Sequence, residues 1–231
     1  MVHALILAGG RGTRAGFDIP KQFIELSGVP LIIRTLREFD GHPAVDSITV
    51  AVPPESIRDT REISERYGIG KLAKVVAGGA TRQQSSFIAV NSLNCSDDDI
   101  VLIHDAARPF AGADLISRVI EAAGREGAAE PAIPVTDTVF AVSPEGKIIS
   151  VPDRKGLVLS QTPQGFRFRI IMDAHEKGAA RGIAADDDIS LVVKNGGNAV
   201  LVKGSAVNIK ITDRMDFIIA EALLKSRADF C

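Results

Sequence analysis

Residues 1–16 read MVHALILAGGRGTRAG, a short apolar run followed by a loop rich in glycine. The run Ala4–Ala8 has the composition of a buried β-strand. Glycines in the loop that follows let backbone N–H groups approach phosphate oxygens closely. A buried strand that leads into such a loop indicates an α/β sheet with a ligand site at the carboxyl edge of its strands.

The next part of the chain alternates strand-like and helix-like segments. We expect further strands at Ser47–Val52, Lys74–Ala77, Ile100–His104 and Ala128–Val135. We expect helices near Leu31–Phe39, Glu55–Tyr67, Thr81–Leu93 and Ala113–Glu126, the third opened by a capping box, Thr81-Arg82-Gln83-Gln84. This alternation predicts an α/β fold with a doubly wound, mostly parallel, Rossmann-like sheet.

The alternation breaks after Pro134. Two short β-type segments, Thr138–Val142 and Lys147–Val151, are joined by a Pro- and Gly-containing link, which predicts a hairpin. A hairpin cannot bury both of its faces by itself. We therefore expect residues 136–156 to form a protruding β-hairpin arm that packs on a second subunit, within one domain spanning 1–231. The core is expected to resume with a helix near Arg167–Ala180, strands at Ala199–Val202 and Asn208–Ile211, and a last helix near Asp213–Arg227.

Composition narrows the function classes. The chain has 231 residues, of which 45% are hydrophobic, and a net charge of −2. No end of the chain is strongly basic, so neither nucleic acid nor a charged membrane surface is an expected partner. We expect no signal peptide, because residues 1–8 lack a charged start and a long apolar stretch, and no apolar run of about 18 residues occurs in the sequence. Two cysteines, Cys95 and Cys231, indicate no disulfide framework, and we expect a cytoplasmic location.

The glycine loop carries an unusual density of positive charge. Arg11, Arg14 and Lys21 lie in one short stretch of a chain that is acidic overall. An arginine can hold two phosphate oxygens and a lysine supplies a compact charge, so three such cations favour a triphosphate over a diphosphate cofactor. A solvated basic loop is the alternative for any one of them.

The same loop matches the dinucleotide-binding fingerprint GxGxxG/A weakly, through Gly10, Gly12 and Ala15. A dinucleotide site should continue into a helix, yet Pro20 interrupts that helix within a few residues. No acidic residue closes the next strand, and the GxxxxGK[ST] pattern is absent from the sequence. An NAD-dependent oxidoreductase is therefore a poor interpretation.

Seven strings of this chain, in order, resemble the sugar-nucleotide and polyol cytidylyltransferases, and most of all the branch that acts on 2-C-methyl-D-erythritol 4-phosphate. They are LAGGRGTR…PKQF (7–14, 20–23), AGG with a serine six residues on (77–79, Ser85), HDAARP (104–109), PVTDT (134–138), DRKGL (153–157), QTPQGF (161–166) and NIKIT (208–212). The resemblance implies a nucleotidyltransferase that couples CTP to a small polyol phosphate and releases pyrophosphate.

The resemblance also assigns roles at the nucleotide. Arg14 and Lys21 match the family's catalytic pair, which would neutralise charge on the α-phosphate. Nucleotide contacts are implied at Ala8, Gly9, Gly10, Gly12, Gly79, Ser85, Asp105, Ala106 and Lys210. Asp105 would also approach Mg²⁺, the expected cofactor, although an aspartate that caps a turn is the alternative. A plain strand-to-helix turn is the alternative for Gly79 and Ser85.

Substrate contacts are implied at Arg108, Thr138, Arg154, Thr162 and Asp186. Thr138 and Arg154 flank the predicted arm, and in the family such residues reach the substrate in the neighbouring subunit, which implies a homodimer. Asp186 departs from the family, because it stands where a threonine is common. The acids at 186–188 would equally suit the start of a helix. His104 is expected to be structural.

Three further functions remain to be distinguished. Ribitol 5-phosphate cytidylyltransferases share the loop, the QTPQ string and the chemistry. A nucleotide-sensing module without catalysis could use the same fold. Such a module would bind CTP but release no pyrophosphate, and an oxidoreductase would require NAD.

Overall fold

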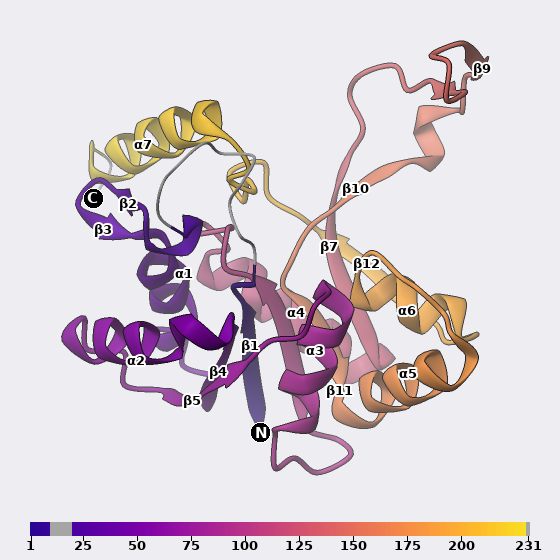
Figure 1. Cartoon of the computed structure of the whole chain (residues 1–231). Coiled ribbons are helices and arrows are strands. Elements are labelled where there is room, and N and C mark those ends of the chain that lie inside the picture. The colour runs from indigo at the N-terminus through magenta and orange to yellow at the C-terminus, as the bar shows by residue number, and fades with distance from the viewer. Residues whose placement is uncertain (10–19, 230–231) are drawn as a thin grey trace.

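In the computed structural model, which describes residues 1–9 and 20–229, eight strands form one central sheet (Figure 1). The strands are β1 (Val2–Leu7), β4 (Ser47–Val52), β5 (Leu72–Ala77), β6 (Ile100–Asp105), β7 (Ala128–Pro134), β10 (Val158–Ser160), β11 (Gln164–Arg167) and β12 (Val200–Lys203). The expected α/β architecture with a mostly parallel sheet is confirmed.

Strands β5, β4, β1 and β6 lie side by side and run parallel. Strand β11 is antiparallel and is inserted between β6 and β7. The start of β7 pairs with β11 and its end pairs with β10, while β12 pairs with the same residues of β7 in parallel. Strand β12 therefore occupies the opposite edge of β7 from β10 and β11. Leu7 aligns with Asp105, so β1 and β6 end at the same level.

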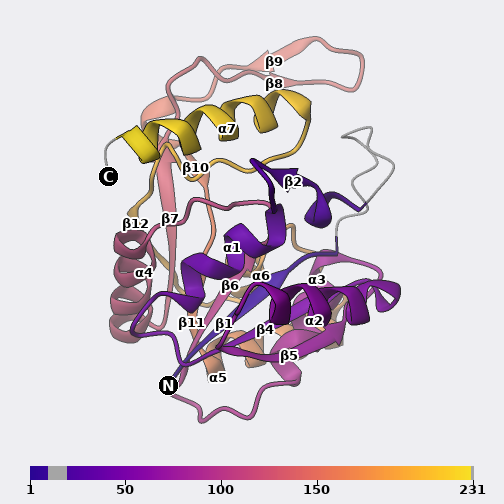
Figure 2. The same ribbon diagram turned by 90° about the vertical axis from the view of Figure 1, so that its left-hand side faces the viewer.

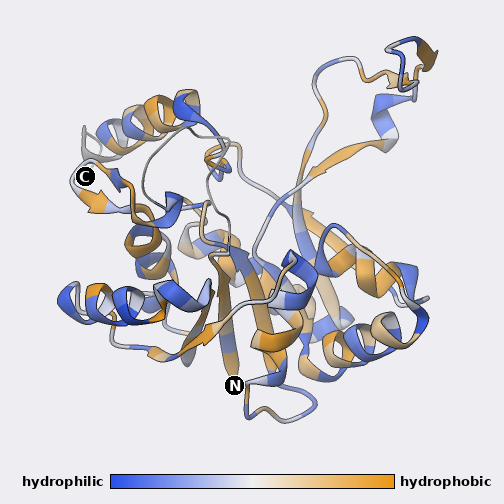
Figure 3. Ribbon diagram, viewed as in Figure 1, coloured by the Kyte–Doolittle hydropathy of each residue, from blue (hydrophilic) through white to orange (hydrophobic). Residues whose placement is uncertain are grey.

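Helices cover both faces of the sheet because successive strand residues point to opposite sides. Ala4 and Ile6 face α1 (Leu31–Asp40), α2 (Ile57–Arg66) and α4 (Ala113–Glu126). Leu5 and Leu7 face α3 (Arg82–Asn91), α5 (Phe168–Arg181) and α6 (Asp188–Lys194). Figure 3 shows the apolar strands between these two layers. Among the described residues, none of the helices has the length and apolar character needed to cross a bilayer.

A smaller hydrophobic cluster lies beside the sheet, and we call it the satellite core. A short hairpin of β2 (Glu25–Leu26) and β3 (Val29–Pro30) packs here against α7 (Arg214–Asp229). Its buried members are Leu26, Leu31, Phe110, Ile211 and Ala220. The 3₁₀ turn η2 (Lys21–Phe23) leads into this hairpin, so the satellite core adjoins the segment that carries Lys21.

The segment between β7 and β10 leaves the body of the molecule and forms the predicted arm (Figures 1 and 2). It contains the hairpin of β8 (Ala141–Val142) and β9 (Ile148–Ser150), followed by the turn η4 (Arg154–Gly156). Gly146 adopts a φ of 81° in the hairpin turn, a conformation that glycine permits without strain. The arm returns to the sheet where Val158 pairs with Pro134.

One expected strand was wrong, and two strands were not expected. Asn208–Ile211 is not a strand; the backbone N–H of Ile211 instead donates a hydrogen bond to Ala107 O, in the loop after β6. Strand β11 falls in a stretch expected to precede a helix, and β10 was not expected either. Pro163, directly before β11, and Gly165 within it both disfavour a strand, so the place of β11 between β6 and β7 comes from tertiary packing.

Gly165 tests that packing. A Cβ added there would lie 2.6 Å from Val119 Cγ1 and 3.0 Å from Ala123 Cβ, both fixed to α4. We expect Gly165→Ala to lower the free energy of unfolding by about 1–3 kcal/mol in urea titrations. Gly124→Ala, on the same helix with nothing within 4 Å of the new methyl, should instead stabilise by up to about 1 kcal/mol. Equal effects of the two substitutions would contradict this packing.

Candidate active site

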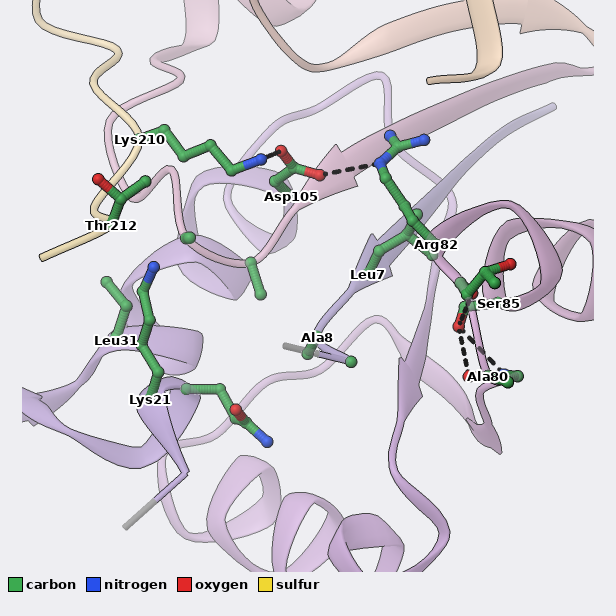
Figure 4. Close-up of a pocket in the computed structure, with 16 residues that line it drawn as sticks. Leu7, Ala8, Lys21, Leu31, Ala80, Arg82, Ser85, Asp105, Lys210 and Thr212 are labelled. Carbon is green, nitrogen blue, oxygen red and sulfur yellow. Dashed lines mark hydrogen bonds and ion pairs between the residues drawn. The ribbon is translucent and has the colours of Figure 1, made fainter. Parts of the chain in front are cut away.

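A pocket of about 540 Å³ opens at the carboxyl ends of β1 and β6, the edge that the sequence indicated. Figure 4 shows side chains from several elements pointing into it, among them Lys21, Asp105 and Lys210. Its lining comprises Leu7, Ala8, Gly9, Lys21, Gln22, Leu31, Gly79, Ala80, Thr81, Arg82, Ser85, Asp105, Ala106, Ala107, Lys210 and Thr212.

One wall of the pocket is the turn between β5 and α3. Thr81 caps the helix, and its side chain accepts a hydrogen bond from Gln84 N at 3.1 Å. The Gln84 side chain reaches Ala80 N rather than the N-cap N–H, so half of the expected capping box forms. Ser85 Oγ accepts from Gly79 N at 3.0 Å and donates to Thr81 O at 2.8 Å.

The glycines of this turn are required by close contacts. A Cβ on Gly78 would lie 2.9 Å from Ser85 Oγ, and one on Gly79 would lie 2.5 Å from Gln84 Cβ. The turn therefore packs tightly against the first turn of α3 and presents its backbone to the pocket. Such a surface suits the flat edge of a nucleotide base, because no side chain intervenes.

Asp105, the last residue of β6, lies at the centre of the charged part of the pocket. Lys210 Nζ lies 2.7 Å from its Oδ2, and Arg82 Nε lies 3.5 Å from its Oδ1 (Figure 4). Burial alone would raise the pKa of this carboxyl, yet the charges of Arg82 and Lys210 lower it to about 2. Asp105 is therefore ionised at neutral pH.

Arg82 is held in place by a second, fully buried carboxylate. Its Nη1 donates to Asp188 Oδ2 at 2.6 Å. Asp188 Oδ1 also accepts from Ser86 Oγ at 2.5 Å and lies 3.2 Å from His175 Nε2. Burial opposes ionisation of Asp188, but contacts with His175 and Arg82 hold its pKa below the usual range. Backbone N–H of Asp188 donates to Gln164 on β11.

Beneath Asp105, another set of polar groups is already paired. Thr162 Oγ1 accepts from Asp105 N at 3.1 Å and lies 3.0 Å from His104 Nδ1. Burial lowers the pKa of His104 to about 4, so this histidine is neutral and structural, as expected. Arg108 donates through Nη1 to Asn208 O at 2.8 Å, and Asn208 Nδ2 donates to Thr162 O.

The structure brings most of the predicted nucleotide residues together. Ala8, Gly9, Lys21, Gly79, Ser85, Asp105, Ala106 and Lys210 all line the one pocket. Gly10, Gly12 and Arg14 lie outside the described residues. The predicted roles of these residues stay predictions.

The predicted substrate residues are more dispersed, since none of them lines the pocket. Arg108 and Thr162 lie behind Asp105 with their side chains engaged. Asp186 is exposed just before α6, where its neighbour Asp187 caps the helix through Ser190 N at 2.7 Å. Thr138 and Arg154 are exposed on the arm.

Sequence reasoning missed Arg82 and Asp188. Arg82 is the first residue of α3, where a positive charge opposes the helix dipole unless a carboxylate compensates it. That unfavourable placement could have indicated that Arg82 pairs with a carboxylate. Asp188 was grouped with its acidic neighbours as a helix start, and its burial could not be read from the local pattern.

The residues of the pocket are compatible with the implied Mg²⁺ if phosphate oxygens of the substrate supply some of its ligands. Mg²⁺ binds proteins through one or two carboxylates, with water and phosphate oxygens as its other ligands. Asp105 supplies one ionised carboxylate that faces the pocket. Within the described residues, the one cluster of three metal-ligating side chains lies elsewhere, so the pocket offers no all-protein cage.

Comparisons with known proteins agree with this geometry. Residues 2–226 match the family model described as 2-C-methyl-D-erythritol 4-phosphate cytidylyltransferase. A curated relative of that name from Geotalea uraniireducens is 43% identical over 97% of both chains. The crystal structure of 4-diphosphocytidyl-2C-methyl-D-erythritol synthase from Anaerococcus prevotii superposes with a TM-score of 0.84 at 30% identity, covering 97% of this chain and 96% of that one. The structure of the Thermus thermophilus enzyme gives 0.78 at 34% identity, covering 96% and 98%.

The charge of Asp105 predicts an acid-dependent loss of stability. Its pKa in the folded state lies below the ordinary value of 3.8, so the stabilisation is complete above that value and disappears as pH falls towards 2. The loss should amount to about 2 kcal/mol in the free energy of unfolding. Urea titrations of Asp105→Asn should lack this component of the pH dependence.

Asp98→Asn is the matched control, since that carboxylate is 83% exposed in a surface ion pair with Arg167. It should follow the wild-type curve. A curve for Asp105→Asn parallel to that of the wild type would mean that Asp105 is not held by these charges.

Proposed function

The chain belongs to the 2-C-methyl-D-erythritol 4-phosphate cytidylyltransferase family, and on that premise we propose how its pocket transfers a cytidylyl group. The enzyme joins CTP to 2-C-methyl-D-erythritol 4-phosphate and releases pyrophosphate, a step of non-mevalonate isoprenoid biosynthesis. The observation that carries the proposal is one pocket lined by Lys21, Asp105 and Lys210 next to a glycine turn, with Lys210 paired to Asp105. A reaction between two polyanions needs such a concentration of cations.

The nucleotide lies between Gly9, at the end of β1, and the turn before α3. Its base meets the backbone of Gly79 and the region of Ser85, which both line the pocket. Its phosphates extend towards Gly9 and the cationic side chains of the opposite wall. Arg14, in the loop that follows Gly9, contributes a further cation to the phosphates.

Chemistry then requires no protein nucleophile, because the substrate phosphate is already an anion. One of its oxygens attacks the α-phosphorus of CTP and forms a new P–O bond. The bond from that phosphorus to the bridging oxygen breaks, and pyrophosphate leaves with the electron pair. Lys21 and Arg14 stabilise the charge that grows on the α-phosphate oxygens during this exchange.

Asp105 is the residue that would hold the divalent cation beside the nucleotide. When bound, Mg²⁺ neutralises part of the triphosphate charge and so makes pyrophosphate a better leaving group. Asp105 would hold that ion, and Lys210, now 2.7 Å from the carboxylate, is positioned to turn towards a phosphate. Arg82 keeps the carboxylate oriented through its contact at 3.5 Å, because Asp188 fixes the guanidinium from behind.

A cytoplasmic location belongs to the same proposal. Cys95 is not engaged in a disulfide, which fits the reducing compartment where free thiols persist. CTP, the nucleoside triphosphate that the enzyme consumes, is also a cytoplasmic metabolite.

Pyrophosphate release tests the function directly. We expect release with CTP and 2-C-methyl-D-erythritol 4-phosphate when Mg²⁺ is present, and none after the metal is removed with a chelator. A coupled assay for pyrophosphate measures both. Equal or greater kcat/KM with ribitol 5-phosphate would overturn the choice of polyol but keep the reaction class. CTP binding without any pyrophosphate release would indicate a nucleotide-sensing module.

The arm supports a homodimer with shared sites. Its surface is apolar although it is exposed: Phe140, Val142, Ile148, Ile149 and Val151 are each between 49% and 68% accessible. Figure 3 shows this apolar colouring at the end of the arm, away from the body. Exposed apolar patches of this kind mark interaction surfaces, and twofold dimers are the commonest assembly. Thr138 and Arg154 on the arm would then complete the pocket of the partner.

Complementation between inactive variants tests the shared site. Lys21→Ala should disable the site of its own subunit, by about a hundredfold, and Arg154→Ala should disable the site of the neighbour. In a mixed dimer, one site carries both lesions and the other carries none. With free subunit exchange, roughly a quarter of all sites should recover wild-type turnover.

A mixture of Lys21→Ala with Lys210→Ala is the matched control. Both lesions lie in the body of the molecule, so every site in a mixed dimer keeps one of them and no activity should return. Lack of recovery in the Lys21→Ala and Arg154→Ala mixture, despite subunit exchange verified by mass spectrometry, would show that the arm serves its own chain.

A further inference from the structure

A second group of chemically reactive side chains lies at the opposite edge of the sheet from the pocket. His3 is near the start of β1, and Cys95 and Asp99 belong to the loop between α3 and β6. Strands β1 and β6 pair from Val2 and Ile100 onwards, so the end of that loop lies beside the start of β1 (Figure 1). The length of β1, roughly 20 Å, separates this group from the pocket.

The three side chains converge on one point. A ring nitrogen of His3, the sulfur of Cys95 and a carboxylate oxygen of Asp99 all lie within 4.8 Å of one another. Asp99 is half-buried, held by a backbone hydrogen bond from Ser96 N at 2.8 Å and by the terminal amine of Met1 at 2.6 Å. Cys95 is half-buried and not in a disulfide.

One ring nitrogen of His3 lacks a hydrogen-bond partner. His3 is only 7% exposed, and its Nε2 is buried with no hydrogen-bond partner among the described residues. The nearest carboxylate oxygen, Asp99 Oδ2, is 3.8 Å away, which is too far for a hydrogen bond. A buried polar atom without a partner destabilises a fold by about 1–3 kcal/mol and calls for a specific explanation.

The other ring nitrogen is already fixed. Nδ1 lies 2.8 Å from Ser47 Oγ on β4. In the tautomer in which Nδ1 donates this hydrogen bond to Ser47, Nε2 carries a lone pair and faces Cys95 and Asp99. A hydrogen bond from the distal ring nitrogen is the usual way in which proteins orient a metal-binding histidine.

We propose that His3, Cys95 and Asp99 form a zinc site. Nitrogen, sulfur and carboxylate oxygen are the donors that Zn²⁺ takes in proteins, whereas Mg²⁺ and Ca²⁺ prefer oxygen alone. Zinc bonds of about 2.0–2.3 Å place ligand atoms about 3.5 Å apart, so the surface loop needs to close by about 1 Å. The Cys95 thiol gives its proton to solvent on binding, and water fills the fourth position.

Such a site would act on stability and not on catalysis. The ion would tie the loop between α3 and β6 to the first strand, at the edge of the sheet that carries no predicted substrate residue. A ligand that binds the folded chain alone raises its stability by mass action. Turnover should therefore be the same with and without bound zinc.

The test uses the full chain stripped of metal, with excess Mg²⁺ to saturate the pocket at Asp105. We expect one Zn²⁺ per chain by calorimetry, and a rise in the thermal midpoint of roughly 5–10 °C at a hundredfold excess over Kd. Co²⁺ in place of Zn²⁺ should give the absorption band of a thiolate ligand. Absence of that band at saturating Co²⁺ in the wild-type chain would by itself overturn the proposal.

Variants identify the ligands. Cys95→Ser, nearly isosteric, and His3→Gln should each weaken Zn²⁺ binding by at least about a hundredfold, and Ser47→Ala by about tenfold. Cys231→Ser is the matched control, because it removes the other cysteine of the chain and should leave binding unchanged. Binding that survives Cys95→Ser, or that is lost in Cys231→Ser, would refute the site.

Discussion

Asp188 carries a charge where almost no water reaches it, and one wall of the active site is built around that constraint. Its side chain is 1% exposed, so protein groups must supply all of its compensation. Those groups come from α3 and α5, through Arg82, Ser86 and His175. Removing a partner from a buried charge costs about 3–5 kcal/mol, which ties these helices into one unit.

The buried charge of Asp188 also determines how the charged side chains of the pocket are oriented. Because Asp188 fixes Arg82, the guanidinium is presented to Asp105 in a defined orientation, and Asp105 in turn engages Lys210. The backbone N–H of Asp188 also meets Gln164, whose amide donates to Glu130 on β7, and Glu130 accepts from Ser160 on β10. One continuous set of hydrogen bonds therefore joins the pocket to the strand on which the arm returns.

Local patterns in the sequence were sufficient for the regular parts of this fold and for the backbone of the site. Strand β4 matches its predicted bounds because it is a continuous, largely apolar run buried on both faces, and helix α4 matches because its apolar residues recur at the helical period of one buried face. The glycine turn, Asp105 and Lys210 could be assigned to one pocket because each belongs to a sequence string that resembles the family. Strand β11 could not be predicted, since Pro163 directly before it and Gly165 within it disfavour a strand, and pairing with β6 and β7 holds it in place. The pairing of Arg82 with Asp188 spans 106 residues, and no local pattern encodes it.

The satellite core has a consequence for the order in which the pocket is assembled. Lys21 adjoins the hairpin that contributes Leu26, and Lys210 precedes Ile211, so the backbone of both lysines belongs to segments that build this small cluster. A cluster with few buried apolar side chains opens locally at a lower free energy than the whole molecule unfolds. Such an opening would withdraw both lysines together and leave Asp105 on an intact strand. A triphosphate that bridges them would therefore act as a tether across the boundary between two folding units, and the ordering of the lysines would be part of its binding free energy.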